Sequence, residues 1–265
     1  MENQMVAYDP QLVERLGLTR EEVQALIDQG ISIEEYAAML GQDLSEEVSN
    51  AQASAVRYSI VHPAQVWKNE ATDETKKSLV GIPVYFHPVR GYFVEGLERP
   101  VCSSLDGKTG QFISEDGERM SRECQKCPFN AWGSGPNGRG KLCKELRRIY
   151  LLEEGHDLPA VVSLPPTSLR VWDAFVAACA YEGLPVSGRV VELTLEKQSS
   201  GAAQVWSTLA KPRTVRRLSP VEYVKIRAMK QQIEEAARQA KVSANEYYAD
   251  AQQAVEAPET TEQTA

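Results

Sequence analysis

Four cysteines within one stretch of the chain are the residues best suited to chemistry. They are Cys102, Cys124, Cys127 and Cys143. Cys124 and Cys127 have the C-x2-C spacing, at which a single tight turn supplies two of the four tetrahedral ligands that zinc prefers. The other two cysteines flank this pair and could close the site. The four thiols therefore predict a structural zinc ion.

Other uses of these cysteines fit the sequence less well. His87 could replace Cys102 as a ligand, although a histidine before Pro88 is also an ordinary residue at the end of a strand. A redox role for the C-x2-C pair would leave the flanking cysteines without a function. Catalytic zinc needs an open coordination position, and the His-x-Glu with Pro-Cys-x-x-Cys signature of zinc deaminases is absent. The fifth cysteine, Cys179, lies in an apolar run and is expected to be a small buried residue.

Basic and aromatic residues surround the cysteines. From Arg119 to Arg148 the chain has eight Lys or Arg residues and two Glu, which is a local charge of +6. Single-stranded nucleic acid is held by cations along its phosphates and by aromatic faces on which bases stack, at about 1–3 kcal/mol per base. The residues predicted to contact it are Arg119, Arg122, Lys126, Phe129, Trp132, Arg139, Lys141, Lys144, Arg147, Arg148, Trp206, Lys211 and Arg213. For Trp206, packing beneath a helix remains an equal alternative.

The charge of the chain is unevenly distributed. The formal net charge is -8, but residues 1–50 carry -9 and residues 246–265 carry -5, which leaves +6 on residues 51–245. A basic domain between acidic ends is typical of a polyanion-binding protein with charged appendages. The 265 residues suffice for one sizeable core. Because the sequence shows neither a long apolar run nor a signal peptide, we expect a cytoplasmic protein without membrane partners, and cysteines that are not in disulfides.

The acidic N-terminal segment, residues 1–50, is predicted to be a helical module. Two capping-box patterns open its helices, Thr19 with Glu22 and Ser32 with Glu35, and Gly30 and Gly41 are expected to end them. A DNA-binding helix-turn-helix is disfavoured, because eleven acidic residues would repel phosphate. An interaction module, or a cap on the core, is favoured.

The central segment, residues 51–218, has the element order of an OB-fold. Apolar and β-branched runs predict strands at 79–94, 146–152, 160–164, 191–196 and 205–209, with a helix from Pro165 to Gly183. The run at 79–94 predicts either one long bent strand or a tight hairpin. A patch at 56–61 could form a further strand, and a helix through 142–152 competes with the second strand. We predict an α+β protein with an OB-like five-stranded β-barrel, whose helix lies between the third and fourth strands. The zinc insert, at 99–148, and the loop Lys197–Ala203 would then meet at one rim.

The C-terminal segment contains one more helix and a tail. Ser219, Pro220 and Glu222 form another capping box with proline at the first helical position. The segment 219–248 is assigned to this helix, which is predicted to run to about Val242, with Val221, Val224, Met229, Ile233 and Ala237 on its apolar side. Residues 249–265 have almost nothing to bury, so we expect a disordered acidic tail.

These features resemble a known family. The segments Cys-Gln-Lys-Cys-Pro-Phe-Asn-Ala-Trp-Gly, at 124–133, and Leu-Pro-Pro-Thr-Ser, at 164–168, together with the element order and the tail, resemble the OB-fold single-stranded DNA-binding proteins of tailed phages and mobile elements, some of which carry a zinc insert. The resemblance covers residues 79–212. It implies sequence-tolerant DNA coating in replication, recombination or repair, in a host cytoplasm if phage-encoded. It also implies that the tail recruits partners or competes for the DNA groove. The tail lacks the terminal aromatic residue of bacterial cellular members, so their partner docking does not carry over.

Two other classes of function are compared with this hypothesis. A zinc-containing protein-interaction module acting on replication or transcription machinery would also use acidic ends, through either the N-terminal helices or the tail. An enzyme is disfavoured, because the chain has no Walker loop, dinucleotide fingerprint or nucleophile elbow. Its three histidines, His62, His87 and His156, are scattered. DNA or RNA as the preferred strand remains open.

Overall fold

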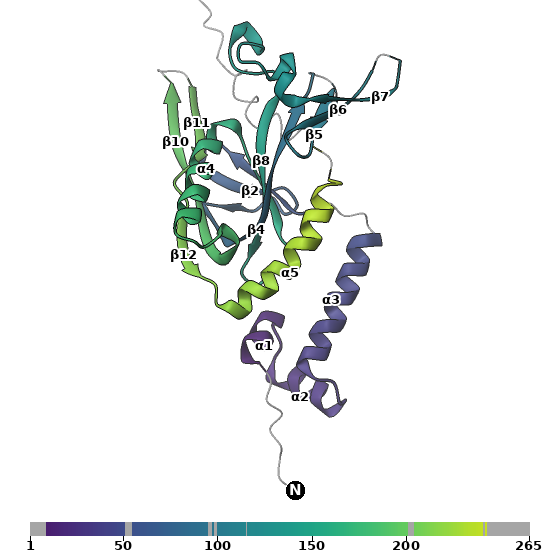
Figure 1. Ribbon diagram of the computed structural model, residues 1–265. Coiled ribbons are helices and arrows are strands. Elements are labelled where there is room, and N and C mark those ends of the chain that lie inside the picture. The colour runs from purple at the N-terminus through teal and green to yellow at the C-terminus, as the bar shows by residue number, and fades with distance from the viewer. Residues whose placement is uncertain are drawn as a thin grey trace, which may run out of the picture. The chain divides into compact units, whose positions relative to one another are not determined.

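The computed structural model describes residues 9–50, 55–94, 97, 100–114, 116–200, 204–240 and 242 (Figure 1). The chain divides into two compact units, Met1–Ala55 and Val56–Ala265. Within the described residues, no helix is both long and apolar enough to cross a membrane. The predicted disordered tail, 249–265, lies outside the described residues.

Three helices are present in the described part of the first unit. They are α1 (Pro10–Leu16), α2 (Arg20–Asp28) and α3 (Ile33–Asn50). Both predicted capping boxes are confirmed: the Thr19 hydroxyl accepts from the Glu22 amide, and the Ser32 amide donates to the Glu35 carboxylate at 2.9 Å. The predicted helix end at Gly41 is wrong, because α3 continues to Asn50. A glycine inside a helix costs only about 1 kcal/mol relative to alanine, which the helix-forming residues on both sides outweigh.

The described residues of the second unit form twelve strands and two α-helices. The strands are β1 (Arg57–Val61), β2 (Val66–Asn69), β3 (Thr75–Lys76), β4 (Ser78–Tyr92), β5 (Cys102–Ser104), β6 (Thr109–Ile113), β7 (Arg119–Glu123), β8 (Lys144–Glu153), β9 (Ala160–Leu164), β10 (Arg189–Ser200), β11 (Gln204–Leu209) and β12 (Arg213–Arg217). The helices are α4 (Pro166–Tyr181) and α5 (Pro220–Ala237), with short 3-10 helices η1 (Cys124–Lys126), η2 (Pro128–Asn130), η3 (Pro136–Gly138) and η4 (Val186–Gly188). The predicted order of strand, insert, two strands, helix and hairpin is confirmed.

The long strand β4 is the centre of the sheet. It pairs antiparallel with β8 along one edge and with β10 along the other, and its register with β8 shifts between Pro83 and Tyr85. The competing prediction of a helix through 142–152 is wrong, because these residues form β8 and pair with β4 and β9.

The strands do not close into the predicted five-stranded barrel. The sheet runs in the order β3-β2-β1-β9-β8-β4-β5-β6-β7, and β10 branches from β4 and carries β11 and β12. Closure would need β11 beside β9, but β1 pairs in parallel with Val161 and Val162 and so occupies that edge of β9. His62, which follows β1, is joined to β11 by two hydrogen bonds: Ser207 N–H donates to His62 Nδ1 at 3.0 Å, and the Ser207 hydroxyl donates to the His62 carbonyl at 2.7 Å. The architecture is therefore a mixed α+β fold with a large, open, mostly antiparallel sheet.

The main core lies between the sheet and α4. Its buried residues include Trp67, Ile149, Leu151, Val162, Trp172, Phe175, Cys179, Leu193 and Leu209. Trp67 is fully buried, and its indole N–H donates to the carbonyl of Leu193 at 3.1 Å, which ties β2 to β10. Cys179 is buried in this core, as predicted.

Helix α5 covers a different part of the sheet. It begins at the predicted capping box of Ser219 and Glu222, and its buried residues Ile226 and Ile233 pack against Val84 and Tyr150 of β4 and β8. Figure 1 shows α5 lying across this region, and it ends at Ala237, well before the predicted boundary.

Candidate metal centre and nucleic-acid interface

The cysteine-bearing insert extends the sheet beyond β4. Strands β5, β6 and β7 form an antiparallel meander beside β4, and the three 3-10 helices η1 to η3 connect β7 to β8. These elements lie within the segment 99–148 assigned to the insert, but its last residues, from Lys144, already belong to β8. In Figure 1 the insert occupies the upper end of the sheet. The described ends of β10 and β11 also lie at that end. The predicted loop Lys197–Ala203 is wrong in its first part, because Lys197 to Ser200 continue β10 and pair with β11, and residues 201–203 lie outside the described residues.

The elements of the insert bring the four cysteines together from distant positions in the chain. Cys102 begins β5, Cys124 begins η1 directly after β7, Cys127 follows η1, and Cys143 directly precedes β8. Cys127 N–H donates to the carbonyl of Cys124 at 3.3 Å, which closes the C-x2-C turn. Cys143 N–H donates to the carbonyl of Phe129 at 2.8 Å, so the last cysteine is held against the segment that follows the turn.

Two of the thiols occupy space that is free only because the neighbouring residue is a glycine and has no side chain. Gly110 lies in β6, and a Cβ atom at this position would come within 2.8 Å of Cys102 Sγ and 3.7 Å of Cys124 Sγ. Contacts below 3.0 Å are not tolerated without movement of the neighbour. The absence of a side chain at Gly110 is therefore what allows thiols from β5 and η1 to meet over β6.

The thiols are also electrostatic neighbours. Burial raises the pKa of Cys102, the thiols of Cys124 and Cys127 raise it further, and Arg122 lowers it. Burial raises the pKa of Cys143 to about 12, against the lowering effect of Arg90, and the other three thiols add to the increase.

Among the described residues, no group of three or more His, Cys, Asp or Glu side chains meets the geometry of a metal site. The four cysteines are the residues of the insert that could hold a metal ion.

Arg90 connects the insert to the central strand. From β4, its Nε donates to the carbonyl of Gly107 at 2.9 Å, and its Nη1 donates to Asn130 Oδ1 at 2.7 Å. Its Nη2 also pairs with the carboxylate of Glu145 in β8. Asn130 in turn donates from Nδ2 to the carbonyl of Cys124 at 2.8 Å. One guanidinium thus fixes the meander, η2 and β8 relative to β4.

The two predicted aromatic residues of the insert differ in exposure. Phe129 is half-buried and stacks on Tyr92, with ring centroids 4.7 Å apart, so it anchors η2 to the end of β4. The Trp132 side chain is 81% exposed. Trp132 is therefore the aromatic face that the insert presents to solvent.

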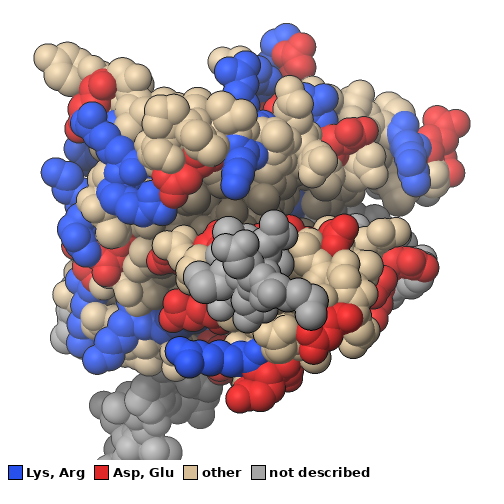
Figure 2. Space-filling view, turned by 90° about the horizontal axis from the view of Figure 1, so that it is seen from below, with Lys and Arg blue, Asp and Glu red and all other residues tan. Residues whose placement is uncertain are grey.

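Several predicted basic residues are exposed. They are Arg119, Lys126, Arg139, Lys141, Lys211 and Arg213. Lys126 pairs with Glu123 at 2.8 Å, and Lys141 donates to Asn130 at 3.1 Å. Arg213 on β12 pairs with Glu192 at 2.7 Å. Figure 2 shows Lys and Arg side chains gathered along the left-hand side of the molecule as seen from below.

The remaining predicted basic residues are less accessible. Arg122 lies over the ring of Phe112, 4.1 Å from its centroid, and its Nη1 is 3.9 Å from Cys127 Sγ. The Arg147 side chain is only 12% exposed and pairs with Asp173 at 3.1 Å, and Lys144 is half-buried. Arg148 is fully buried, and its Nη1 donates to the carbonyl of Ala240 at 3.0 Å beyond α5. Arg148 is thus removed from the surface available to a ligand.

The two remaining candidate residues, Trp206 and His87, pack against other parts of the protein. Trp206 on β11 pairs with Gln198 and is half-buried, with its indole nitrogen inaccessible, so it combines packing with a partly exposed ring. His87 is buried, its Nδ1 is 2.9 Å from the carbonyl of Leu105, and its ring stacks on Tyr85 and Tyr150.

Arg90, Tyr92 and Gly110 belong to the site but are not among the residues predicted from the sequence. A glycine between Thr109 and Gln111, inside a run of strand-forming residues, is a signal of close approach by another group and could have indicated Gly110. Arg90 and Tyr92 lie in an ordinary strand sequence, and only their contacts reveal their role.

Comparisons with known proteins add no further information. No family model matches the chain, and no curated protein or solved structure matches it at a significant level.

Proposed function

We propose that this protein binds single-stranded nucleic acid, DNA in the first instance, at the end of the sheet that carries the cysteine insert. In this proposal zinc, held by Cys102, Cys124, Cys127 and Cys143, shapes the insert. The strand contacts the exposed loop that connects β7 to β8. The observation that carries the proposal is the exposure of Trp132 on a loop whose other large aromatic residue is fixed by packing.

Trp132 has the properties of a base-stacking platform. The indole is 81% exposed, so it can offer a ligand much of the about 150–250 Å² of surface that an aromatic side chain can bury. Stacking of one base on such a ring is worth about 1–3 kcal/mol and tolerates any base. This favours binding without a strict sequence requirement.

The neighbouring cations suit a phosphate backbone. Lys126, Arg139 and Lys141 lie on the same loop and are exposed. The ion pair of Lys126 with Glu123 is on the surface, where such pairs contribute about 0–1 kcal/mol, so a phosphate can replace the carboxylate. Each phosphate contact would release counterions and make the affinity depend on salt.

A bound zinc ion would offset the unfavourable interaction among neighbouring buried thiolates. Burial and the neighbouring thiols raise the pKa of Cys102 and Cys143, so these two groups are unfavourable as free thiolates. A bound zinc ion stabilises thiolates directly and draws them into a tetrahedron. The space over Gly110 and the positive charge of Arg122 support this use of the site.

The strand arrangement supports an OB-like architecture of an open kind. Strands β10, β4, β8 and β9 are consecutive neighbours, and α4 lies between β9 and β10 in the chain. This is compatible with the resemblance to phage single-stranded DNA-binding proteins. Because α5 packs on part of β4 and β8, the nucleic acid is proposed to cross the rim formed by the insert and the β10–β11 hairpin.

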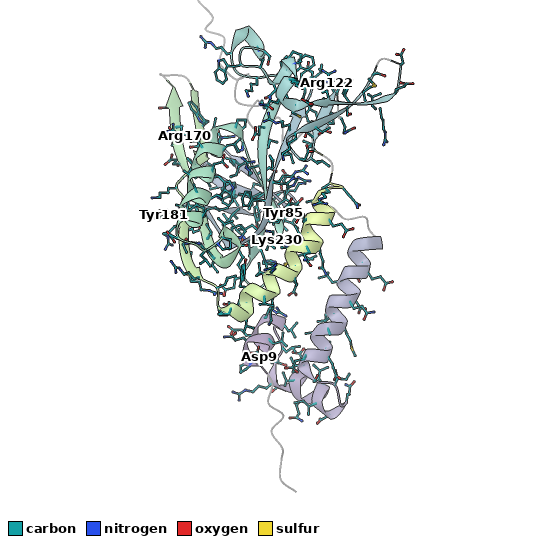
Figure 3. All side chains as sticks on the ribbon, in the orientation of Figure 1. Asp9, Tyr85, Arg122, Arg170, Tyr181 and Lys230 are labelled. Atoms are coloured by element: carbon teal, nitrogen blue, oxygen red, sulfur yellow. The ribbon has the colours of Figure 1, made fainter. Side chains whose placement is uncertain are left out.

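The decisive experiment measures fluorescence anisotropy of labelled oligo-dT. We expect micromolar or tighter binding at low salt that weakens steeply as salt is added. Trp132→Ala should weaken binding about ten-fold, because one stacking contact is lost. Tyr181→Ala is the matched control: Tyr181 is 95% exposed on α4, and Figure 3 places it away from Arg122 and the insert.

A second set of variants tests the cations. Replacing Lys126, Arg139 and Lys141 by Gln should reduce the slope of log affinity against log salt by about 2 to 3, since three phosphate contacts are removed. The same change at Lys225, Arg227 and Lys230, which are exposed on α5, should leave the slope unchanged. Failure of the chain to bind oligo-dT at low salt, both intact and without residues 249–265, would reject the proposal.

A further inference from the structure

The outermost strand of the insert lies at an edge of the sheet. Strand β7 is the last strand along its path in the sheet, and among the described residues it pairs with β6 alone. Figure 1 shows β6 and β7 projecting from the rest of the sheet. An exposed edge of this kind presents backbone donors and acceptors to another strand.

Two hydrogen bonds establish which backbone groups face outward. Ser114 N–H donates to the carbonyl of Glu118, and Cys124 N–H donates to the carbonyl of Lys108, on either side of the β6–β7 ladder. In an antiparallel ladder, every second residue directs both of its backbone groups to the same neighbour. Since the ladder has no register shift, the even-numbered residues of β7 face β6. Arg119, Ser121 and Glu123 therefore direct their N–H and C=O groups to the open edge.

The side chains on this edge are complementary in charge to those of a second, antiparallel copy of the same strand. The strand reads Arg-Met-Ser-Arg-Glu, with Ser121 at its centre. When two copies pair antiparallel about Ser121, Arg119 of each copy lies opposite Glu123 of the other. Both positions direct their backbone N–H and C=O groups outward. The register that places opposite charges side by side therefore also allows backbone hydrogen bonds between the two copies.

We propose that β7 is a self-association edge, at which two copies of this chain pair antiparallel about a two-fold axis through Ser121. The occupant is a second copy because the charge pattern is complementary to itself. A two-fold contact of this type is closed, so it produces a dimer and not a filament. The interface is short, so association is weak and becomes apparent only at raised protein concentration.

The exposed side chains of β7 are compatible with this contact. The Glu123 side chain is 65% exposed, and its surface pair with Lys126 can be exchanged for Arg119 of the second copy. Met120 is 44% exposed and would lie opposite Arg122, whose guanidinium covers the ring of Phe112. The contact thus covers an apolar side chain as well as joining opposite charges.

The test exchanges the charges of Arg119 and Glu123. Sedimentation equilibrium over a range of protein concentrations then measures the mass of each variant in solution. The unmodified chain should show a mass that rises towards that of a dimer. Arg119→Glu and Glu123→Arg, each alone, should weaken dimerisation about ten-fold, because each places like charges opposite one another twice. The double variant R119E/E123R restores both opposite pairs and should regain the original affinity.

A measurement on the unmodified chain tests the proposal even if the variants misfold. Amide hydrogen exchange followed by NMR should show protection of Arg119, Ser121 and Glu123 that increases with protein concentration. Protection of Met120 and Arg122 should not depend on concentration, because these amides bond to β6. The proposal is overturned if the chain stays monomeric at the highest concentration, if the double variant remains as weak as the single ones, or if the three outward amides show no concentration dependence. These readouts use no nucleic acid, so they stand apart from the proposed function.

Discussion

The thiol of Cys102 lies over Gly110, so close that a methyl group on that glycine would come within 2.8 Å of the sulfur. The two residues belong to neighbouring strands of the insert, β5 and β6, and the same methyl group would lie 3.7 Å from Cys124 Sγ. The space above one glycine thus determines whether thiols from separate elements can meet.

Gly110→Ala is expected to lower the zinc affinity of the protein. The added methyl must displace Cys102 or bend β6, so the proposed ligands lose their common position. Metal affinity should fall by about 10–100-fold, the range seen when groups that orient ligands are removed. Competition with a chromogenic zinc chelator measures this change. The control is Gly41→Ala in α3, where a methyl meets nothing within 4 Å, and unchanged metal affinity is expected there.

Removal of zinc is expected to unfold the insert selectively. The segment around η1 to η3 is held by few buried side chains, so chelation, or Cys124→Ser, should lower both thermal stability and oligo-dT affinity. Metal analysis should give one zinc per chain for the unmodified protein and none for the variant. Cys179→Ala is the control, because Cys179 lies in the main core and should keep the metal. A metal-free protein in which Cys124→Ser folds and melts normally would contradict the zinc site.

Arg90→Ala is expected to detach the insert from β4. The guanidinium bonds to Gly107, Asn130 and Glu145, and its loss leaves partly buried acceptors unsatisfied. Urea denaturation should show a loss of about 2–3 kcal/mol, as is usual for charge-assisted hydrogen bonds. Tryptophan fluorescence is a suitable signal because all four tryptophans lie in the second unit. Arg213→Ala, at an exposed ion pair, should cost no more than about 1 kcal/mol.

The start of α5 is expected to lose stability at low pH through Glu222. Its hydrogen bonds with Arg216, and then with Ser219, lower the pKa of this carboxyl to about 2. A lowered pKa means that the carboxylate stabilises the folded state fully above the unfolded pKa of 4.5, and that this contribution is lost as the pH falls towards 2.

Glu222→Gln should therefore be less stable than the unmodified protein at pH 7, by about 1 kcal/mol or less because the pair is partly exposed. The difference should shrink between pH 4.5 and pH 2, as followed by urea denaturation at several pH values. Glu235→Gln, at an exposed position later in α5, is the control and should show little change at any pH. A difference that stays constant down to pH 3 would contradict this assignment.

The sequence by itself was sufficient for those features that interactions between near neighbours in the chain determine. The capping boxes at Thr19, Ser32 and Ser219 depend on residues three apart, so the start of each helix follows from short-range hydrogen bonds. The hairpin of β10 and β11 likewise follows from alternating residues on either side of a polar turn. The C-x2-C turn is also local, so its two cysteines could be placed together without the fold.

Only the tertiary structure determined whether the sheet closes into a barrel, and which side chains are buried or exposed to solvent. The predicted barrel is open because β1 takes the edge of β9, a pairing between residues about 100 positions apart that no local pattern contains. Arg148 and Trp132 both looked like nucleic-acid contacts, yet one is buried beside Ala240 and the other is 81% exposed. Burial depends on which segments pack together, and the cost of ordering distant segments is offset only by contacts that exist in the complete fold. For the same reason the space over Gly110, and the open edge of β7, become visible only once the strands are paired.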